Sequence, residues 1–128
     1  MNQKRVDRVL KNLEAKGLSQ IMISDPYSIF YLTGRFIRPG ERFFALYLNR
    51  NGNHKIYIND LFTVPEDLGI EKVRFPDTED AVGLFCGSTD RGSALGVDKK
   101  LQARFLLRMM ELRAAAGFVN ASDCVALA

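Results

Sequence analysis

Short segments rich in β-forming residues alternate along this chain with segments of helical spacing, and this alternation constrains the fold more than any other feature. Apolar segments with the length of buried strands cover residues 20–23, 71–75, 94–97 and 118–120. Segments rich in helix formers cover residues 3–16, 26–33, 81–85 and 99–116. Strands that alternate with helices predict a layered domain of the α/β class, with helices on both faces of a sheet, as a three-layer α/β/α arrangement.

One further pair of strands is predicted to be antiparallel. The segments "RFFALYLN" and "HKIYI" are rich in β-formers, and Asn51 and Gly52 between them favour the left-handed backbone of a tight turn. We therefore expect a hairpin that pairs residues 42–49 with residues 54–59. The hairpin makes the sheet mixed, with about five or six strands in all. The residues between 60 and 70 are expected to form a short helix or an irregular connection, because Pro65 interrupts them.

Several polar residues and glycines are positioned to begin or end these helices. Asp25 offers an N-cap oxygen to the helix over residues 26–33, and Gly34 suits the residue that ends it. Asp77 and Asp80 resemble a capping pair for the helix over residues 81–85. Gly117 is predicted to end the long helix that precedes it.

Composition and charge narrow the function classes. The 128 residues are 47% hydrophobic and 26% charged, which is typical of one globular domain. No apolar run approaches the roughly 18 to 20 residues of a membrane-spanning helix, and the N-terminal segment lacks the apolar core of a signal peptide. We therefore expect a cytoplasmic protein with no membrane partner. The net charge of +3 is not gathered into a basic stripe, so no nucleic-acid partner is expected.

Residue types that often carry catalysis are sparse. His54 is the single histidine, and we interpret it as an exposed strand residue rather than a metal ligand. Cys86 and Cys124 lack metal-ligand spacing and are interpreted as reduced structural thiols. The stretch "CGSTDRGSALG" precedes a strand, whereas phosphate loops follow one, so we interpret it as a connecting loop. No catalytic residue, cofactor or metal ligand is predicted in this chain.

The stretch "DPYSIFYLTG" resembles the "N-I-x-Y-L-T-G" pattern of the N-terminal domain in the creatinase/prolidase/aminopeptidase P family. "PGERFFALYLNRNGN" is similar to the strand and turn that follow it there, and "LGVDKKLQARFLLRMMELR" is similar to a later strand and helix. The resemblance covers nearly all of the chain. It implies a creatinase N-terminal domain with a ribonuclease H-like motif over residues 1–128, of which residues 118–128 would lead into a linker to an absent catalytic domain.

The family resemblance also implies a function. Family members cleave the bond before proline in Xaa-Pro dipeptides or longer peptides, using two divalent metal ions held by two Asp, one His and two Glu of a following catalytic domain. The positions of those ligands do not exist in this sequence. The resemblance therefore implies a non-catalytic domain that contributes to oligomerisation and to shaping or gating the substrate cleft. The implied partners are its own catalytic domain, further copies in a homo-oligomer, and a proline-containing peptide.

An arginine-rich loop follows the short helix and is the candidate contact surface. Arginine forms bidentate pairs with carboxylates, and Pro39 and Gly40 allow a sharp turn. The N-terminal domain of family members overhangs the substrate cleft, often that of the partner subunit, so we hypothesise that this loop contacts substrate or a partner subunit. The candidate residues are Arg35, Phe36, Ile37, Arg38, Glu41 and Arg42.

Two alternatives stay open. One is a protein-binding module of a pseudo-peptidase without catalysis, which the presence or absence of the five metal ligands downstream would distinguish. The other is a small nuclease-like enzyme, which requires several carboxylates converging on one strand end. The aspartates fall at turn and cap positions, where local roles are common, and we interpret them in that way. The residues concerned are Asp60, Asp77, Asp80, Asp90 and Asp98.

Overall fold

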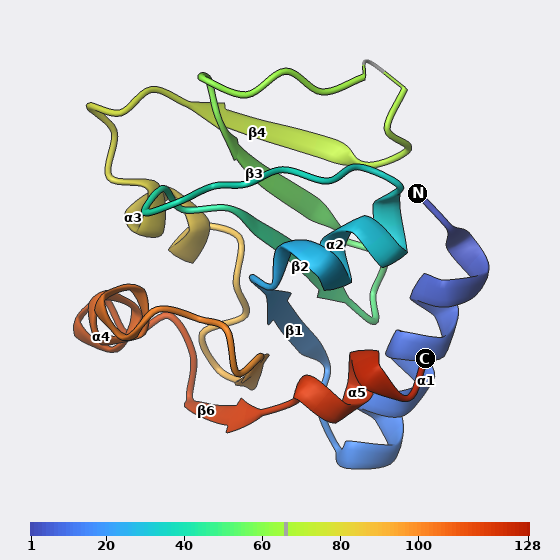
Figure 1. Ribbon diagram of the computed structural model, residues 1–128. Helices are drawn as coiled ribbons and strands as arrows, with labels where there is room; N and C mark the ends of the chain where they lie inside the picture. The colour runs from blue at the N-terminus through green and yellow to red at the C-terminus, as the bar shows by residue number, and fades with distance from the viewer. Residues whose placement is uncertain (66) are drawn as a thin grey trace.

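The computed structural model describes residues 1–65 and 67–128, and its helices and strands follow the predicted order as far as the last strand (Figure 1). A final helix over residues 122–126 was not predicted. The helices are α1 (Gln3–Lys16), α2 (Pro26–Thr33), α3 (Ala81–Cys86), α4 (Ala103–Glu111) and α5 (Ser122–Ala126). The strands are β1 (Gln20–Ile23), β2 (Ala45–Asn49), β3 (Lys55–Asn59), β4 (Glu71–Phe75), β5 (Ala94–Val97) and β6 (Gly117–Asn120).

The strands form a six-stranded mixed sheet in the order β4-β3-β2-β1-β5-β6, which confirms the predicted fold class. β2 is antiparallel to both of its neighbours, β1 and β3. The pairs β3–β4, β1–β5 and β5–β6 are parallel. Among the described strands, β2 alone is therefore reversed. The last residues of the other five strands and the first residue of β2 lie at the same end, which we call the carboxyl end of the sheet.

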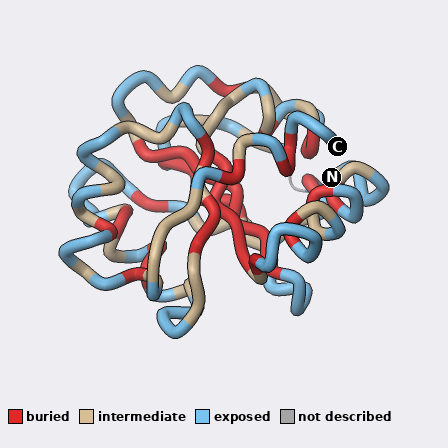
Figure 2. The backbone as a smooth tube through the Cα atoms, turned by 90° about the horizontal axis from the view of Figure 1, so that it is seen from below, coloured by how far each residue is buried: buried red, intermediate tan, exposed pale blue. Residues whose placement is uncertain are grey.

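Helices cover both faces of the sheet, as Figure 1 shows. Successive strand residues point to opposite faces, so Ile21 and Ile23 join the core beneath α1, α2 and α5, while Met22 joins the core beneath α3 and α4. Phe85 of α3 and Met109 of α4 are fully buried in the second core. Figure 2 shows the buried backbone gathered at the centre, in the strands, with exposed backbone on the outer helices and loops. This is the expected three-layer arrangement.

The short helix α2 begins and ends where its sequence predicts. The Oδ1 atom of Asp25 accepts a hydrogen bond from the Tyr27 N–H, which caps the first turn. Gly34 follows the last turn with φ of 80°, and its N–H bonds to the Phe30 carbonyl oxygen. A residue with a Cβ rarely adopts that backbone conformation, so glycine suits this position.

The long helix is shorter than predicted, and the prediction that Gly117 ends it is wrong. α4 ends at Glu111, and Arg113 adopts φ of 53°. This left-handed residue turns the chain back toward the sheet, where Ala114 is fully buried. Gly117 is instead the first residue of β6.

The predicted capping pair is also only half correct. Asp80 is the N-cap of α3, with its Oδ1 atom accepting a hydrogen bond from the Gly83 N–H at 3.1 Å. Asp77 lies outside that helix and binds Arg42 and Asn59 instead. The prediction failed because an aspartate one turn before a helix carries the same local signal whether its partner is near or far along the chain.

The hairpin forms around the predicted turn, but its strands are shorter than predicted. Gly52 adopts φ of 91°, and the strands begin at Ala45 and Lys55. His54 precedes the second strand and is half-buried, so the expectation of an exposed residue is wrong. Its Nδ1 atom accepts a hydrogen bond from the Asn49 N–H at 3.2 Å, and burial lowers the pKa of the imidazole.

The connection over residues 60–70 has no regular helix in its described part, and Glu66 lies outside the described residues. Cationic side chains hold several of its carbonyl groups. Arg35 donates to the Thr63 oxygen, and Arg74 donates to the Phe62 oxygen. Within the described chain, no helix is long and apolar enough to cross a membrane.

Candidate functional site at the carboxyl end of the sheet

Residues 35–42, which we call the arginine loop, run from the end of α2 toward the carboxyl end of the sheet, where β2 begins (Figure 1). Ile37 anchors the middle of the loop, because its side chain is only 5% exposed and lies in the core beneath α1 and α2. Arg35 lies just after the C-terminal end of α2, where its Nη2 atom donates a hydrogen bond to the Thr63 carbonyl oxygen at 2.6 Å. These two members of the predicted contact set therefore serve the fold.

Arg42 fastens the far end of the arginine loop. Its Nε and Nη2 atoms donate to the two carboxylate oxygens of Asp77, each at 3.1 Å. Asp77 also accepts a hydrogen bond from Asn59 at 2.7 Å. The bonds from Arg42 and Asn59 hold the pKa of Asp77 below its ordinary value. The guanidinium of Arg42 is thus already engaged in the bidentate carboxylate pairing that the sequence suggested for a ligand.

Side chains at the start of α4 also bind the turn of the arginine loop. The Nε2 atom of Gln102 donates to the Gly40 carbonyl oxygen at 3.2 Å. The Nη2 atom of Arg104 donates to the Glu41 carbonyl oxygen. Backbone groups of the turn are therefore bound by side chains some 60 residues later, and the loop is held in one conformation.

The side chains of Arg38 and Glu41 take no part in these attachments. Both residues are exposed, and neither side chain has a hydrogen bond or ion pair within the described part of the chain. The Arg38 guanidinium carbon lies 5.7 Å from the centre of the Phe36 ring. Phe36 packs in turn against Tyr27, with ring centres 5.1 Å apart. Of the six predicted contact residues, Arg38 and Glu41 are those whose side chains remain available.

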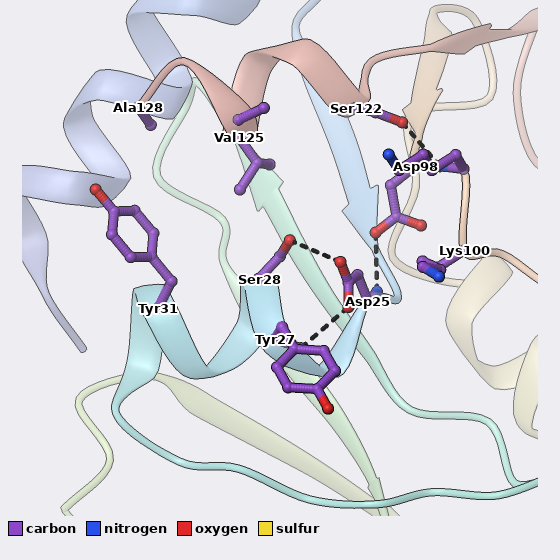
Figure 3. A pocket seen from close by; sticks show the side chains of 11 residues that line it. Asp25, Tyr27, Ser28, Tyr31, Asp98, Lys100, Ser122, Val125 and Ala128 are labelled. Carbon is purple, nitrogen blue, oxygen red and sulfur yellow. Dashed lines mark hydrogen bonds between the residues drawn. The ribbon is translucent and has the colours of Figure 1, made fainter.

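A cavity of about 450 Å³ lies beside the arginine loop, at the carboxyl ends of three parallel strands (Figure 3). Asp25 follows β1, Asp98 follows β5 and Ser122 follows β6. The chain leaves β1 toward α2 on one face of the sheet and leaves β5 toward α4 on the other. Connections that diverge in this way open a crevice at the strand ends, where α/β proteins commonly bind ligands.

Asp98 organises this crevice, and the interpretation of it as a local turn residue is wrong. Its carboxylate is 7% exposed. The Oδ2 atom accepts hydrogen bonds from the N–H groups of Ser24 and Asp25 at 2.8 and 2.9 Å, and Oδ1 accepts one from the Ser24 hydroxyl at 2.6 Å. Asp98 therefore joins the end of β5 to the end of β1. Its position directly after a buried strand indicates a location at a strand end, but no local pattern in the sequence indicates the contact with β1.

Side chains from α2, α5 and the segment after β5 complete the wall of the cavity. In Figure 3 Val125 points from α5 toward α2, where Tyr31 and Tyr27 lie. The Arg5 guanidinium carbon lies 4.1 Å from the centre of the Tyr31 ring, which holds the ring in place. Lys99 and Lys100 line the opposite side, and both are exposed.

A second, smaller hollow of about 390 Å³ lies between the arginine loop and α4. Two pairs of oppositely charged side chains lie in it. Arg108 lies 2.7 Å from Asp80, and Arg42 binds Asp77. The hydrogen bonds raise the pKa of Arg108 and lower that of Asp80. The Arg108–Asp80 pair joins α4 to the start of α3, and the Arg42–Asp77 pair joins the arginine loop to the segment before α3.

The remaining chemistry-bearing residues serve the core. Both cysteines, Cys86 and Cys124, are free and buried, and burial raises the pKa of each thiol. Within residues 1–65 and 67–128, no group of three or more His, Cys, Asp or Glu side chains is placed to hold a metal ion.

A mixed six-stranded sheet with helices on both faces defines the class, an α/β domain. The family described as the creatinase/prolidase N-terminal domain matches residues 5–127, and the chain belongs to this family. This confirms the resemblance carried by the "DPYSIFYLTG" stretch.

Solved structures share the fold. The creatinase/prolidase N-terminal domain of an X-Pro dipeptidase from Streptococcus pyogenes has a TM-score of 0.82 and 19% identity, with 100% of both chains covered. The dipeptidase PepE from Mycobacterium ulcerans has a TM-score of 0.80 and 24% identity over 98% of this chain and 35% of its own. An uncharacterized peptidase of Staphylococcus haemolyticus is 32% identical over 53 residues, which are 41% of this chain. The match spans only 15% of that relative's length.

Proposed function

We propose that this chain acts as the non-catalytic N-terminal domain of a cytoplasmic Xaa-Pro dipeptidase or aminopeptidase. In this role it contributes to oligomerisation and shapes the substrate cleft of a metal-dependent catalytic domain, which would hold both divalent ions. Membership of the family supports the proposal. So does the match to about a third of a longer dipeptidase chain, which corresponds to one domain of a larger protein.

The observation that carries the proposal is the construction of the arginine loop. Ile37, the Arg42–Asp77 pair and the bonds from α4 fix its backbone, while Arg38 and Glu41 stay exposed at its tip. A contact loop that is ordered before binding loses less conformational entropy on binding than a flexible one. Several long-range contacts hold this surface loop in one conformation, which suits a segment that binds another molecule in a defined position.

Arg38 has the chemistry for a peptide or a partner surface. Its guanidinium can donate two parallel hydrogen bonds to a carboxylate, such as the C-terminus of a peptide. The neighbouring Phe36 and Tyr27 rings offer apolar contact beside that charge. A proline ring and a terminal carboxylate are close together in an Xaa-Pro substrate, which fits this combination.

The test uses the full-length parent protein. Arg38→Ala is expected to lower kcat/KM for an Xaa-Pro dipeptide about tenfold, or to reduce the oligomeric mass measured by light scattering, because it removes one charge-assisted contact. Arg50→Ala is the matched control, since Arg50 is an exposed arginine beyond the opposite end of β2. If Arg38→Ala changes neither the kinetics nor the oligomeric mass, the arginine loop contacts neither the substrate nor a partner subunit through Arg38, and the proposed role is wrong.

A further inference from the structure

We propose that the cavity at the carboxyl ends of β1, β5 and β6 binds a small zwitterion of the free α-amino acid class. In this arrangement Asp25 receives the ammonium group, Lys99 and Lys100 receive the carboxylate, and the side chain lies against Tyr31 and Val125. The inference concerns this chain alone and does not rest on the proposed role in peptide cleavage.

The acidic side of the cavity has unused acceptor capacity at Asp25. Its Oδ1 atom accepts the Tyr27 N–H at 3.1 Å, and its Oδ2 atom accepts the Ser28 hydroxyl at 3.3 Å (Figure 3). A carboxylate offers about four lone-pair positions, so Asp25 can accept further bonds from a ligand. Asp98 differs, because it is buried and already accepts three hydrogen bonds. Asp25 is therefore the carboxylate that a bound ammonium group would meet.

The basic side of the cavity is formed by two adjacent lysines. The side chains of Lys99 and Lys100 line the cavity, and neither has a hydrogen bond or ion pair with any residue that the structure describes. The backbone beneath them is fixed, because the Lys99 N–H donates to the Ser122 hydroxyl at 2.8 Å. Two ammonium groups on a fixed backbone, with Lys100 on the same side of the cavity as Asp25 (Figure 3), provide a position for a carboxylate.

The apolar part of the cavity is preformed. Val125 is 8% exposed and belongs to the core beneath α1 and α2. Tyr31 is held by Arg5, whose Nη1 atom also donates to the Tyr31 carbonyl oxygen at 2.8 Å. The volume of about 450 Å³ lies within the range of about 300–1,000 Å³ that is usual for small-molecule sites. A branched aliphatic side chain fits such a wall.

Charges of both signs around one cavity favour a zwitterion over a simple ion. An anion alone would be repelled by the Asp25 carboxylate, and a cation alone would be repelled by the two lysines. A ligand with both groups satisfies each wall at once. At the rim, the Ala128 oxygen accepts a hydrogen bond from the Nη1 atom of Arg8 at 3.3 Å.

The experiment follows chemical shifts of the chain by NMR during titration with L-leucine and with two analogues that each lack one charge. These analogues are 4-methylpentanoate, which lacks the ammonium group, and 3-methylbutylamine, which lacks the carboxylate. Leucine is expected to bind saturably, with shifts at residues around the cavity, and each analogue about tenfold more weakly. Equal binding of either analogue, or no saturable binding of leucine, overturns the proposal.

Two variants locate the site. Asp25→Asn removes the charge but keeps a good N-cap, so α2 remains capped. Lys100→Gln changes an exposed side chain, so the variant is expected to fold with nearly unchanged stability. Each is expected to weaken leucine binding about tenfold, and Lys11→Gln, an exposed lysine on α1, is expected to leave it unchanged. Binding unaffected by both site variants, or weakened equally by Lys11→Gln, would place the ligand elsewhere and refute the assignment.

Discussion

Asp98 offers the sharpest test of how the carboxyl end of the sheet is held together. Its carboxylate accepts two backbone N–H groups and one hydroxyl from residues more than 70 positions earlier. Asp98→Ala removes all three hydrogen bonds and leaves the N–H groups of Ser24 and Asp25 without this acceptor. Hydrogen bonds to charged groups contribute about 1.5–3 kcal/mol each. Taking the low end for a site beside a cavity, we expect a loss of about 4 kcal/mol, a large share of the roughly 5–15 kcal/mol typical of a domain.

Asp98→Asn is the informative companion to the alanine variant. The amide oxygen can accept both N–H groups, and the amide NH₂ can donate to the Ser24 hydroxyl, which reverses the direction of that one bond. All three contacts then persist without the charge, so the expected loss is only about 1 kcal/mol. Ser24→Ala, which removes the hydroxyl alone, is expected to cost a similar amount.

Urea unfolding at constant m-value measures these losses. Asp7→Ala is the control, because Asp7 is an exposed aspartate on α1 whose side chain has one described hydrogen bond, from Gln3, and we expect a change within about 0.5 kcal/mol. The reasoning fails if Asp98→Ala costs less than about 1 kcal/mol, or if Asn and Ala at this position cost the same. Either result would mean that the three hydrogen bonds do not join β5 to β1 energetically.

Two further predictions concern packing and pH. A Cβ at Gly96 would lie 2.8 Å from the Cβ of Ala121, so Gly96→Ala is expected to destabilise the domain by about 1–3 kcal/mol in urea unfolding, and adding Ala121→Gly should recover part of the loss. Burial lowers the pKa of His54 below its unfolded value, so its contribution to stability is complete above about pH 6.5 and declines as the pH falls below that value. His54→Gln should therefore reduce the dependence of the thermal unfolding midpoint on pH between about pH 7 and pH 5. An unchanged pH dependence would contradict the role given to the buried imidazole.

The order of elements could be read from the sequence because its signals are local. Asp25 indicates where α2 begins and Gly34 indicates where it ends, and the two lie within ten residues of each other. Asn51 and Gly52 indicate the turn of the hairpin in the same way. The end of α4 could not be read in this way. Its sequence continues with good helix formers, and the burial of Ala114 against the sheet outweighs that local preference.

The candidate site was less predictable than the fold, because it depends on which strands become neighbours. The arginine loop could be recognised as a segment, yet the roles of Ile37 as an anchor and Arg42 as a tether depend on contacts with the core and with Asp77. The role of Asp98 likewise appears only once β5 lies beside β1. Local sequence patterns carry no signal for such pairings, which are decided by the packing of the whole sheet.

The direction of the strands explains why both candidate surfaces lie at one end of the molecule. Five strands end there, so the polar residues that follow them gather at that end, and reversed β2 must be entered from it through the arginine loop. Tyr27 lies between the two surfaces, because it lines the cavity and packs against Phe36 of the loop. Arg38 does not line the cavity, and Lys100 is not a residue of the arginine loop. Replacing Arg38 should therefore leave leucine binding intact, and replacing Lys100 should leave peptide cleavage intact, so the two proposals stand or fall separately.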